Sequence, residues 1–459
     1  MKLSKWQQIR LVKGIATSAR NKLVADSLLR ANEISLALND GAISRVDISQ
    51  LGANQPVEDF YSGSKCLSSD AYFFGVFDGH AGAACSRHVS TRLYDYLCAA
   101  VLSKHEINKI KNLAERLQWV CSNADRKLPP SVREVHEENV QKFYERFSQN
   151  PDVGTVRKAL QTAFSSLDED LANGAMPDSH GQVCRMSVNV AASGSCALVS
   201  HLRECHLHVA NCGDSEAVLG VSNPSTGISA RLLSRPHTVD NADEISRVRM
   251  SHPASESATI LKGGRLLGEL YPLRAFGDLR YKWSLELQRV VLEPLGVPAP
   301  RNLHTPPYLT AQPEVLYHRL TPNDKFLVLA SDGLWDFLDP DTVVRLIEDH
   351  TLGTQTLSDY QPPVGHTLGD ILKDLEKRKK GDARTKLLDE NSATHVIRNA
   401  LGGCSGGPEL QYARLYESLQ LPPGTARHFR DDITVIVIHF NEHFLIEQHL
   451  ANETSVTNI

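Results

Sequence analysis

Short apolar runs that end at an aspartate are the clearest pattern along the chain. Residues 72–77 (YFFGVF) are mostly aromatic or β-branched, which is typical of a buried strand. This run stops at Asp78-Gly79, a pair that favours a turn. Two more apolar runs, 326–331 and 433–440, also have aspartates at one end. We therefore predict three strands that each carry a carboxylate at one end.

Helical periodicity separates these strands. Apolar residues recur at every fourth position along 89–97, and 156–171 has helical spacing too, so both stretches are predicted to be helices. A third helix is predicted over about residues 105–121, and Asp339 followed by Pro340 has the pattern of a helix start. Turn-bounded strands fill much of the middle of the chain. This order predicts an α+β fold with mainly antiparallel sheets and helices packed on them.

No clear linker divides the chain, so we expect one large domain over residues 50–440, although 459 residues would suggest two or three. Two less regular stretches, near 101–154 and 351–428, are interpreted as elaborations of this domain. Residues 441–459 are assigned to a C-terminal tail. The longest apolar runs are strand-length, which argues against a membrane-spanning helix.

The first residues of the chain are basic. Asp26 is the first acidic residue, and six Lys or Arg residues precede it among scattered apolar ones. This composition is typical of a mitochondrial transit peptide, which we place in residues 1–30. A basic N-terminus without a targeting role is the alternative.

Charge and cysteine content narrow the class of protein. The net charge of -5 argues against a general nucleic-acid binder, whose surface would be basic. The nine cysteines are odd in number and form no CxxC pair, which favours free thiols in a reducing compartment. The basic run Lys377–Lys380 has two interpretations, a solvated face or a docking patch for an acidic partner.

The predicted carboxylates suggest a chemistry. Aspartates gathered from several strand ends offer hard oxygen ligands for a divalent cation such as Mg²⁺ or Mn²⁺. A pair of such ions would activate a water molecule and hold a phosphate for attack. His80, two residues after Asp78, could then protonate the leaving serine oxygen. Neither a G-x-S-x-G elbow nor a P-loop is present, so no serine nucleophile or nucleotide-binding loop is predicted.

Six short blocks occur in a fixed order along the chain. They are Asp78 to Gly82 (DGHAG), Ser193 to Ser195 (SGS), Gly213 to Ser215 (GDS), Arg274 to Asp278 (RAFGD), Ser331 to Asp336 (SDGLWD) and Asp431 to Val435 (DDITV). Each block alone is weak, but the ordered set resembles the metal-dependent Ser/Thr protein phosphatase family (PPM, type 2C) over about residues 50–440. The resemblance implies a central antiparallel β-sandwich flanked by helices, with the metals at one end.

Four stretches resemble one branch of that family, the mitochondrial phosphatases that act on pyruvate dehydrogenase. They are residues 54–59 (NQPVED), 78–85 (DGHAGAAC), 304–309 (HTPPYL) and 324–329 (DKFLVL). The resemblance implies a location in the mitochondrial matrix and, as substrate, the phosphorylated alpha subunit of pyruvate dehydrogenase. It also implies two partners as expectations: the lipoyl domain of the acetyltransferase core, with Ca²⁺, and a regulatory subunit.

The resemblance assigns a role to several residues. It implies that Asp78 bridges two ions and that Gly79 offers its backbone carbonyl oxygen to one of them. Asp332 and Asp431 would complete the other site, and Glu58 would hold a metal-bound water.

Weaker roles carry alternatives. Asp214 and Asp336 match a third metal position, but Asp214 could simply belong to a tight turn and Asp336 could cap a helix. His80 matches the proton donor, and its alternative is a hydrogen-bonded structural histidine.

Two positions depart from the family pattern. The phosphate-binding arginine expected four residues before Glu58 is replaced by Asn54, so phosphate binding would rely on the metals, on the Asn54 amide or on a basic group from elsewhere in the chain. The arginine expected after Gly-Asp-Ser is Glu216, for which the sequence offers no role. A type 2C phosphatase for another phosphoprotein and a non-catalytic pseudophosphatase that only binds remain the alternative functions.

Overall fold

The computed structural model describes residues 19–101, 116–127, 130–149, 155–225, 227–353, 365–379, 388–422 and 424–456. Most of the predicted transit segment, parts of both predicted elaborations and the end of the basic run Lys377–Lys380 lie outside the described residues. The chain divides into two compact units. The first comprises Met1–Gln55, Val218–Arg231 and Pro322–Ile459, and the second comprises Pro56–Ala217 and Leu232–Thr321.

The first unit contains a six-stranded sheet. Its strand order is β1 (Ile34–Asp40), β2 (Ile43–Leu51), β17 (Ile433–Phe440), β16 (Asp324–Ala330), β10 (Glu216–Asn223) and β11 (Gly227–Leu232). Strand β1 pairs antiparallel with β2, β2 with β17, and β17 with β16. Every residue of β17 is buried, including the polar Thr434 and His439.

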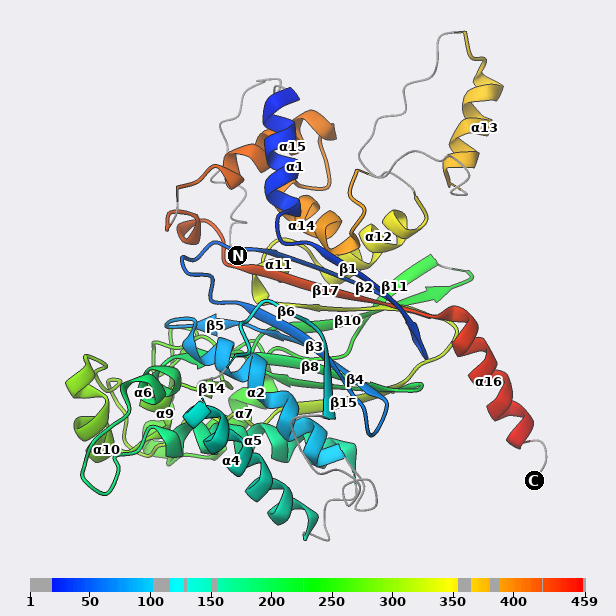
Figure 1. Cartoon of the computed structure of the whole chain (residues 1–459). Coiled ribbons are helices and arrows are strands. Elements are labelled where there is room, and N and C mark those ends of the chain that lie inside the picture. The colour runs from blue at the N-terminus through cyan, green and yellow to red at the C-terminus, as the bar shows by residue number, and fades with distance from the viewer. Residues whose placement is uncertain are drawn as a thin grey trace. The chain divides into compact units, whose positions relative to one another are not determined.

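Helices cover one face of this sheet (Figure 1). The helices of this unit are α1 (Ala19–Arg30), α11 (Asp332–Trp335), α12 (Pro340–Thr351), α13 (Leu368–Lys379), α14 (Ser392–Gly402), α15 (Gly407–Leu419) and α16 (Glu442–Val456). Buried side chains of α12 and α14, including Val344 and Ile397, form one apolar core with Val435 and Val437 of β17. The helix start predicted at Asp339 is confirmed, because its carboxylate accepts a hydrogen bond from the Thr342 N–H at 2.9 Å.

The second unit contains another six-stranded sheet. Its antiparallel order is β15 (Glu314–Arg319), β9 (His206–Cys212), β8 (Ala197–Arg203), β4 (Ala71–Phe77), β3 (Phe60–Cys66) and β6 (Leu117–Ser122). Two small sheets complete the unit. One consists of β14 (Phe276–Gly277), β7 (Gly194–Ser195) and β5 (Gly79–His80), and the other of β12 (Leu261–Lys262) and β13 (Arg265–Leu266).

Two long helices pack on the larger sheet of this unit (Figure 1). They are α2 (Ala84–Val101) and α5 (Val156–Gly174), accompanied by α4 (Pro130–Ser148). The residues at every fourth position of α2, Val89, Leu93 and Leu97, are fully buried against Phe73 and Phe77 of β4. The remaining helices are α6 (Arg185–Ala192), α7 (Ala242–Met250), α8 (Ser257–Ile260), α9 (Leu279–Lys282) and α10 (Leu285–Val291).

The predicted α+β class, with antiparallel sheets flanked by helices, is confirmed. One element was predicted wrongly: residues 117–121, assigned to a helix, belong to strand β6, which pairs with β3. The segment contains Trp119 and Val120, whose side chains favour a strand, and the pairing with β3 outweighs the helical spacing. Residues 105–115 of the predicted helix lie outside the described residues.

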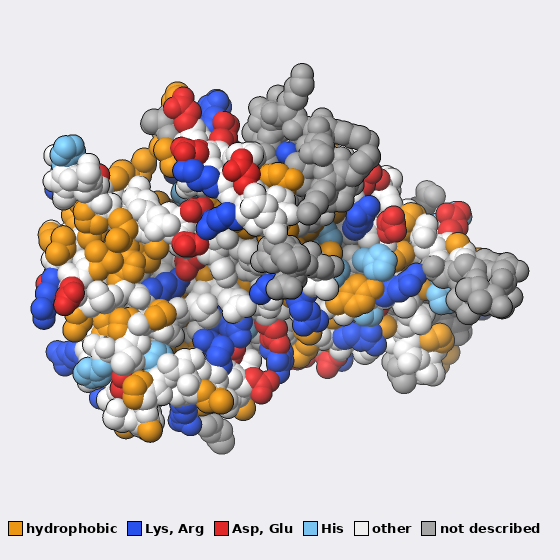
Figure 2. All heavy atoms as spheres, turned by 90° about the horizontal axis from the view of Figure 1, so that it is seen from below, with side chains coloured by type: hydrophobic (Ala, Val, Ile, Leu, Met, Phe, Trp, Pro, Cys, Tyr) orange, Lys and Arg blue, Asp and Glu red, His pale blue; other side chains and the backbone are white. Residues whose placement is uncertain are grey.

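Most of the cysteines are buried, whereas several apolar side chains are exposed on the surface. All nine cysteines are free, and seven of them are buried. Within the described ranges, no helix combines the length and the hydrophobicity that a membrane span requires. Figure 2 shows apolar side chains concentrated at the left of the view. Exposed apolar side chains on α6 and α10 include Met186, Leu285 and Val290. Exposed apolar residues are common on protein surfaces, so we assign them no role.

A buried ion pair holds α14 in the first unit and also contacts α1. The guanidinium of Arg398, on α14, donates two hydrogen bonds of 2.7 Å to the carboxylate of Asp389, and neither side chain is exposed to solvent. The same guanidinium contacts Asp26 of α1 at 2.8 Å. Removing one partner of such a pair leaves a buried charge without compensation.

We expect Arg398→Met to lower the free energy of unfolding by about 3–5 kcal/mol, because Asp389 would lose its buried counter-charge. Urea denaturation of the full chain measures this change. The matched control is Lys325→Met, which breaks the exposed pair with Glu442 and should cost about 1 kcal/mol or less. Equal losses in the two variants would contradict a special role for the buried pair.

Candidate metal centre

Strand β4 fixes the position of Asp78. All seven residues of β4 are buried, and the Asp78 carbonyl accepts a hydrogen bond from the Cys196 N–H at 2.8 Å. Gly79 follows with no room for a side chain, since a Cβ atom there would lie 2.3 Å from the Glu58 carbonyl oxygen. The Asp78 carboxylate therefore projects from the end of a rigid strand and is only half-buried.

Asp214 lies just beyond β9 and is buried. Its Oδ1 accepts a hydrogen bond from the Cys196 thiol at 3.1 Å. The preceding residue, Gly213, has a φ of 122°, and a Cβ atom there would lie 2.2 Å from the Cys196 sulfur. A glycine is required at this turn, and the turn directs Asp214.

Asp332 is the first residue of α11 and is separated from the end of β16 by Ser331 alone. The preceding Ser331 and Thr434 of β17 exchange hydrogen bonds of 3.1 and 3.0 Å. A Cβ atom on Gly333 would lie 2.0 Å from the Asp432 carbonyl oxygen. This close packing brings the start of α11 against the segment that holds Asp431 and Asp432.

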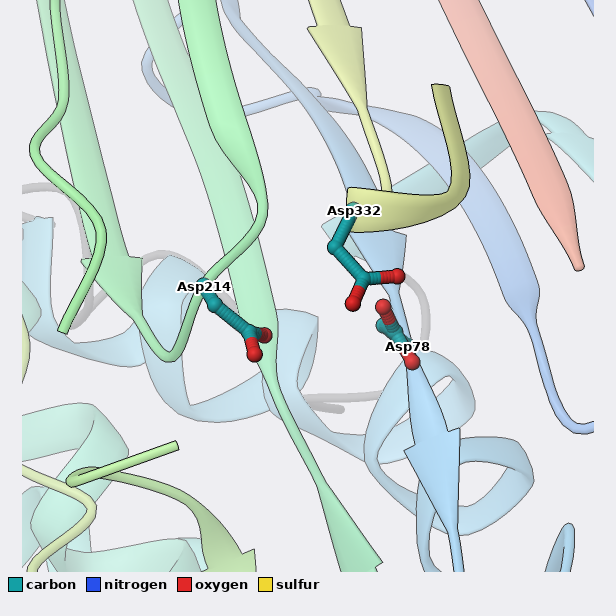
Figure 3. Close-up of side chains that lie close together, drawn as sticks. All are labelled: Asp78, Asp214 and Asp332. Carbon is teal, nitrogen blue, oxygen red and sulfur yellow. The ribbon is translucent and has the colours of Figure 1, made fainter. Parts of the chain in front are cut away.

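Asp78, Asp214 and Asp332 form a compact carboxylate group (Figure 3). One oxygen of each lies within 4.8 Å of the others, and no other such group of three or more His, Cys, Asp or Glu was found among the described residues. Three carboxylates this close repel one another unless a cation or protons compensate their charge. Hard oxygen donors at this separation fit a divalent cation such as Mg²⁺ or Mn²⁺.

Other predicted ligands lie outside that group. Asp431 Oδ1 accepts hydrogen bonds of 3.2 Å from the Asn54 amide and of 3.2 Å from the Arg427 guanidinium. Glu58 Oε1 accepts a hydrogen bond of 2.6 Å from the Gly82 N–H. Asp336 is exposed at the C-terminal end of α11. Metal binding by these three residues, and by the Gly79 carbonyl, stays a prediction.

His80 is paired with a residue that the sequence analysis did not single out. Its Nε2 lies 2.6 Å from Oδ2 of the buried Asp278. Gly194 makes room for the pair, since a Cβ atom there would lie 2.0 Å from His80 Nε2. Partial burial alone would lower the pKa of His80, but Asp278, with smaller effects of Asp214 and Glu58, raises it above the usual value. A protonated imidazole can serve as a proton donor.

The Asp278 turn is itself held firmly. Asp278 has a φ of 53°, and its N–H donates to the Ser193 carbonyl at 3.0 Å. Asp168 on α5 accepts hydrogen bonds from the Gly277 N–H and the Lys282 ammonium, both at 2.8 Å. The signal for Asp278 in the sequence was the block RAFGD, which contributed to the family resemblance but was assigned no role in the site.

Glu216 also belongs to the surroundings of the carboxylate group. Burial and the nearby charge of Asp214 raise the pKa of Glu216 to about 7. The arginine expected at this position would have placed a positive charge next to Asp214, whereas Glu216 places there a carboxyl group that resists ionisation.

Comparison with known proteins was made on sequence and on structure. The chain matches the family described as Protein phosphatase 2C over residues 97–361. It is 38% identical over 457 residues to the human protein "[Pyruvate dehydrogenase [acetyl-transferring]]-phosphatase 1, mitochondrial", covering 91% of this chain and 82% of that protein. It is also 38% identical to the human protein "[Pyruvate dehydrogenase [acetyl-transferring]]-phosphatase 2, mitochondrial", again covering 91% of this chain and 82% of that protein. A serine-threonine phosphatase 2C from Toxoplasma gondii superposes with a TM-score of 0.42 and 17% identity, over 89% of this chain and 99% of that one.

We expect Asp78→Asn and Asp332→Asn each to weaken Mn²⁺ binding at least about tenfold, because each removes one charged oxygen ligand. Isothermal titration of the full chain with MnCl₂ measures this affinity. The matched control is Asp70→Asn, since Asp70 is exposed and stands at the opposite end of β4. Unchanged affinity in both variants would contradict the carboxylate group as a metal centre.

Proposed function

The chain belongs to the protein phosphatase 2C family, and we propose that it removes phosphate from serine residues of the alpha subunit of pyruvate dehydrogenase in the mitochondrial matrix. The carboxylate group of Asp78, Asp214 and Asp332 is the observation that carries the catalytic part of this proposal. The substrate part is supported by the printed names of the two human relatives, which are mitochondrial phosphatases of pyruvate dehydrogenase.

The carboxylate group would hold Mg²⁺ or Mn²⁺. When bound, such ions lower the pKa of water and neutralise the charge of a phosphate group. We propose two ions, with Asp431 and the Gly79 carbonyl as additional ligands and with Glu58 holding a metal-bound water. A third, weaker position would involve Asp214 and Asp336. Like-charge repulsion among the aspartates supports binding of more than one positive charge.

His80 would supply the proton. Its Nε2 is engaged by Asp278 at 2.6 Å, which fixes the plane of the ring and favours the protonated form. The serine oxygen that leaves the phosphate needs a proton, because an alkoxide is a poor leaving group. Asp278 is in this proposal a positioning residue, since it acts through His80.

We also propose a targeting segment, the extent of the catalytic domain and the partners. Residues 1–30 would direct the chain to mitochondria, and residues 50–440 would form the catalytic domain. The lipoyl domain of the acetyltransferase core, with Ca²⁺, and a regulatory subunit are proposed partners. The names of the relatives support the pyruvate dehydrogenase system as the common target.

The deciding experiment is phosphate release by the purified full chain from phosphorylated pyruvate dehydrogenase complex, with and without Mg²⁺. We expect release that requires the metal, that is lost in Asp78→Asn and that persists in Asp70→Asn. Release only from unrelated phosphoproteins would assign another substrate. No release from any phosphoserine substrate, with either Mg²⁺ or Mn²⁺, would show a non-catalytic binding protein.

Leaving groups of different acidity test the role of His80. We expect His80→Ala to slow hydrolysis of a phosphoserine peptide about 100-fold or more, within the usual range for general acid catalysis. Hydrolysis of p-nitrophenyl phosphate should fall much less, because p-nitrophenolate leaves without a proton. An equal loss on both substrates would show that His80 does not donate the proton.

A further inference from the structure

We propose that Arg427 binds the phosphate group of the substrate and that Asn54 orients it for this task. This inference rests on the proposed phosphatase function, and it names the basic group of the site. The sequence analysis left phosphate binding to the metals, to the uncharged Asn54 amide or to an unidentified basic group from elsewhere in the chain. Arg427 was missed because it lies 373 residues further along the chain.

Asn54 is held in one orientation by its own contacts. Its side-chain N–H groups donate to Asp431 Oδ1 at 3.2 Å and to Asp432 Oδ2 at 3.0 Å. Its backbone N–H donates to Asp432 Oδ1 at 2.8 Å. With the amide nitrogen directed at the two carboxylates, the amide oxygen faces the other way and accepts a hydrogen bond from Arg427 Nη1 at 2.8 Å. Asn54 therefore acts on Arg427 as a positioning residue.

Two arginines, Arg427 and Arg430, lie near Asp431, and they differ in burial and in hydrogen-bond partners. Arg430 is buried and donates to the backbone carbonyls of Leu51 and Gly52, so it joins β2 to the segment before β17. The side chain of Arg427 is 48% exposed and contacts Asp431 Oδ1 at 3.2 Å. Of the two, Arg427 is accessible to a ligand from solvent.

The chemistry of Arg427 suits a phosphate. A guanidinium is planar, always charged and offers five N–H donors in a fork that matches two phosphate oxygens. Its exposed ion pair with Asp431 contributes little, so a dianionic phosphate can compete for the guanidinium at low cost. Asn54 limits the rotation of the side chain, which reduces the entropy lost when phosphate binds.

A purely structural role for Arg427 makes a different prediction. If Arg427 only supported Asp431, its loss would weaken metal binding and leave phosphate binding unchanged once metal is saturating. Measuring the two affinities separately distinguishes the roles.

The test compares Arg427→Met and Arg427→Lys with Arg345→Met in the full chain. Arg345 is an exposed arginine on α12 that bonds within its own helix, to the Asp341 carbonyl and Thr342. At saturating Mg²⁺, we expect Arg427→Met to raise both the KM for a phosphoserine peptide and the inhibition constant of inorganic phosphate about 10- to 100-fold. Arg427→Lys should shift both less, because it keeps the charge but loses the fork. The control should stay within about twofold.

A second readout needs no turnover. Inorganic phosphate should raise the melting temperature of the metal-free wild-type chain more than that of Arg427→Met, because ligand binding to the folded state stabilises it. Unchanged KM and phosphate inhibition in Arg427→Met, or a loss confined to Mg²⁺ affinity, would overturn the proposal. Absence of phosphate release by the wild-type chain would instead overturn the proposed function, so the two failures are distinguishable.

Discussion

Repulsion between carboxylates is the constraint on which the site depends. Asp78, Asp214 and Asp332 have oxygens within 4.8 Å of one another, although three negative charges favour separation. Within each unit, the strand that carries the carboxylate is well packed. Every residue of β4 and nearly every residue of β16 is buried, so Asp78 and Asp332 each have a fixed backbone position within their own unit. A divalent cation that binds there would remove the repulsion and thereby stabilise the folded chain.

Close backbone packing at glycines makes this arrangement possible. A Cβ atom would lie 2.3 Å from a carbonyl oxygen at Gly79, 2.0 Å from the His80 ring at Gly194 and 2.0 Å from a carbonyl oxygen at Gly333. These glycines belong to three of the sequence blocks that carry the family resemblance. Each of these blocks is specific because it contains a position where any side chain would collide with a neighbouring atom.

The polar groups around the carboxylates have distinct environments. His80 is held by Asp278, which is itself fixed in a left-handed turn beside Asp168 and Lys282. Asn54 connects Asp431 and Asp432 to the guanidinium of Arg427. Glu216 and Asn54 stand at the two positions where the family pattern led us to expect an arginine, and the positive charge beside Asp431 comes from Arg427.

The sequence by itself determined the main strands and helices, the α+β class and the family. Local patterns suffice for these, because periodicity and turn pairs record which side chains must be buried. Tertiary structure decided that residues 117–121 form a strand, because pairing with β3 outweighed their helical spacing of apolar residues. It also revealed the pairs His80–Asp278 and Asn54–Arg427, whose members lie 198 and 373 residues apart. Contacts over such distances depend on how the strands are ordered in the sheets, and no local pattern in one sequence specifies that order.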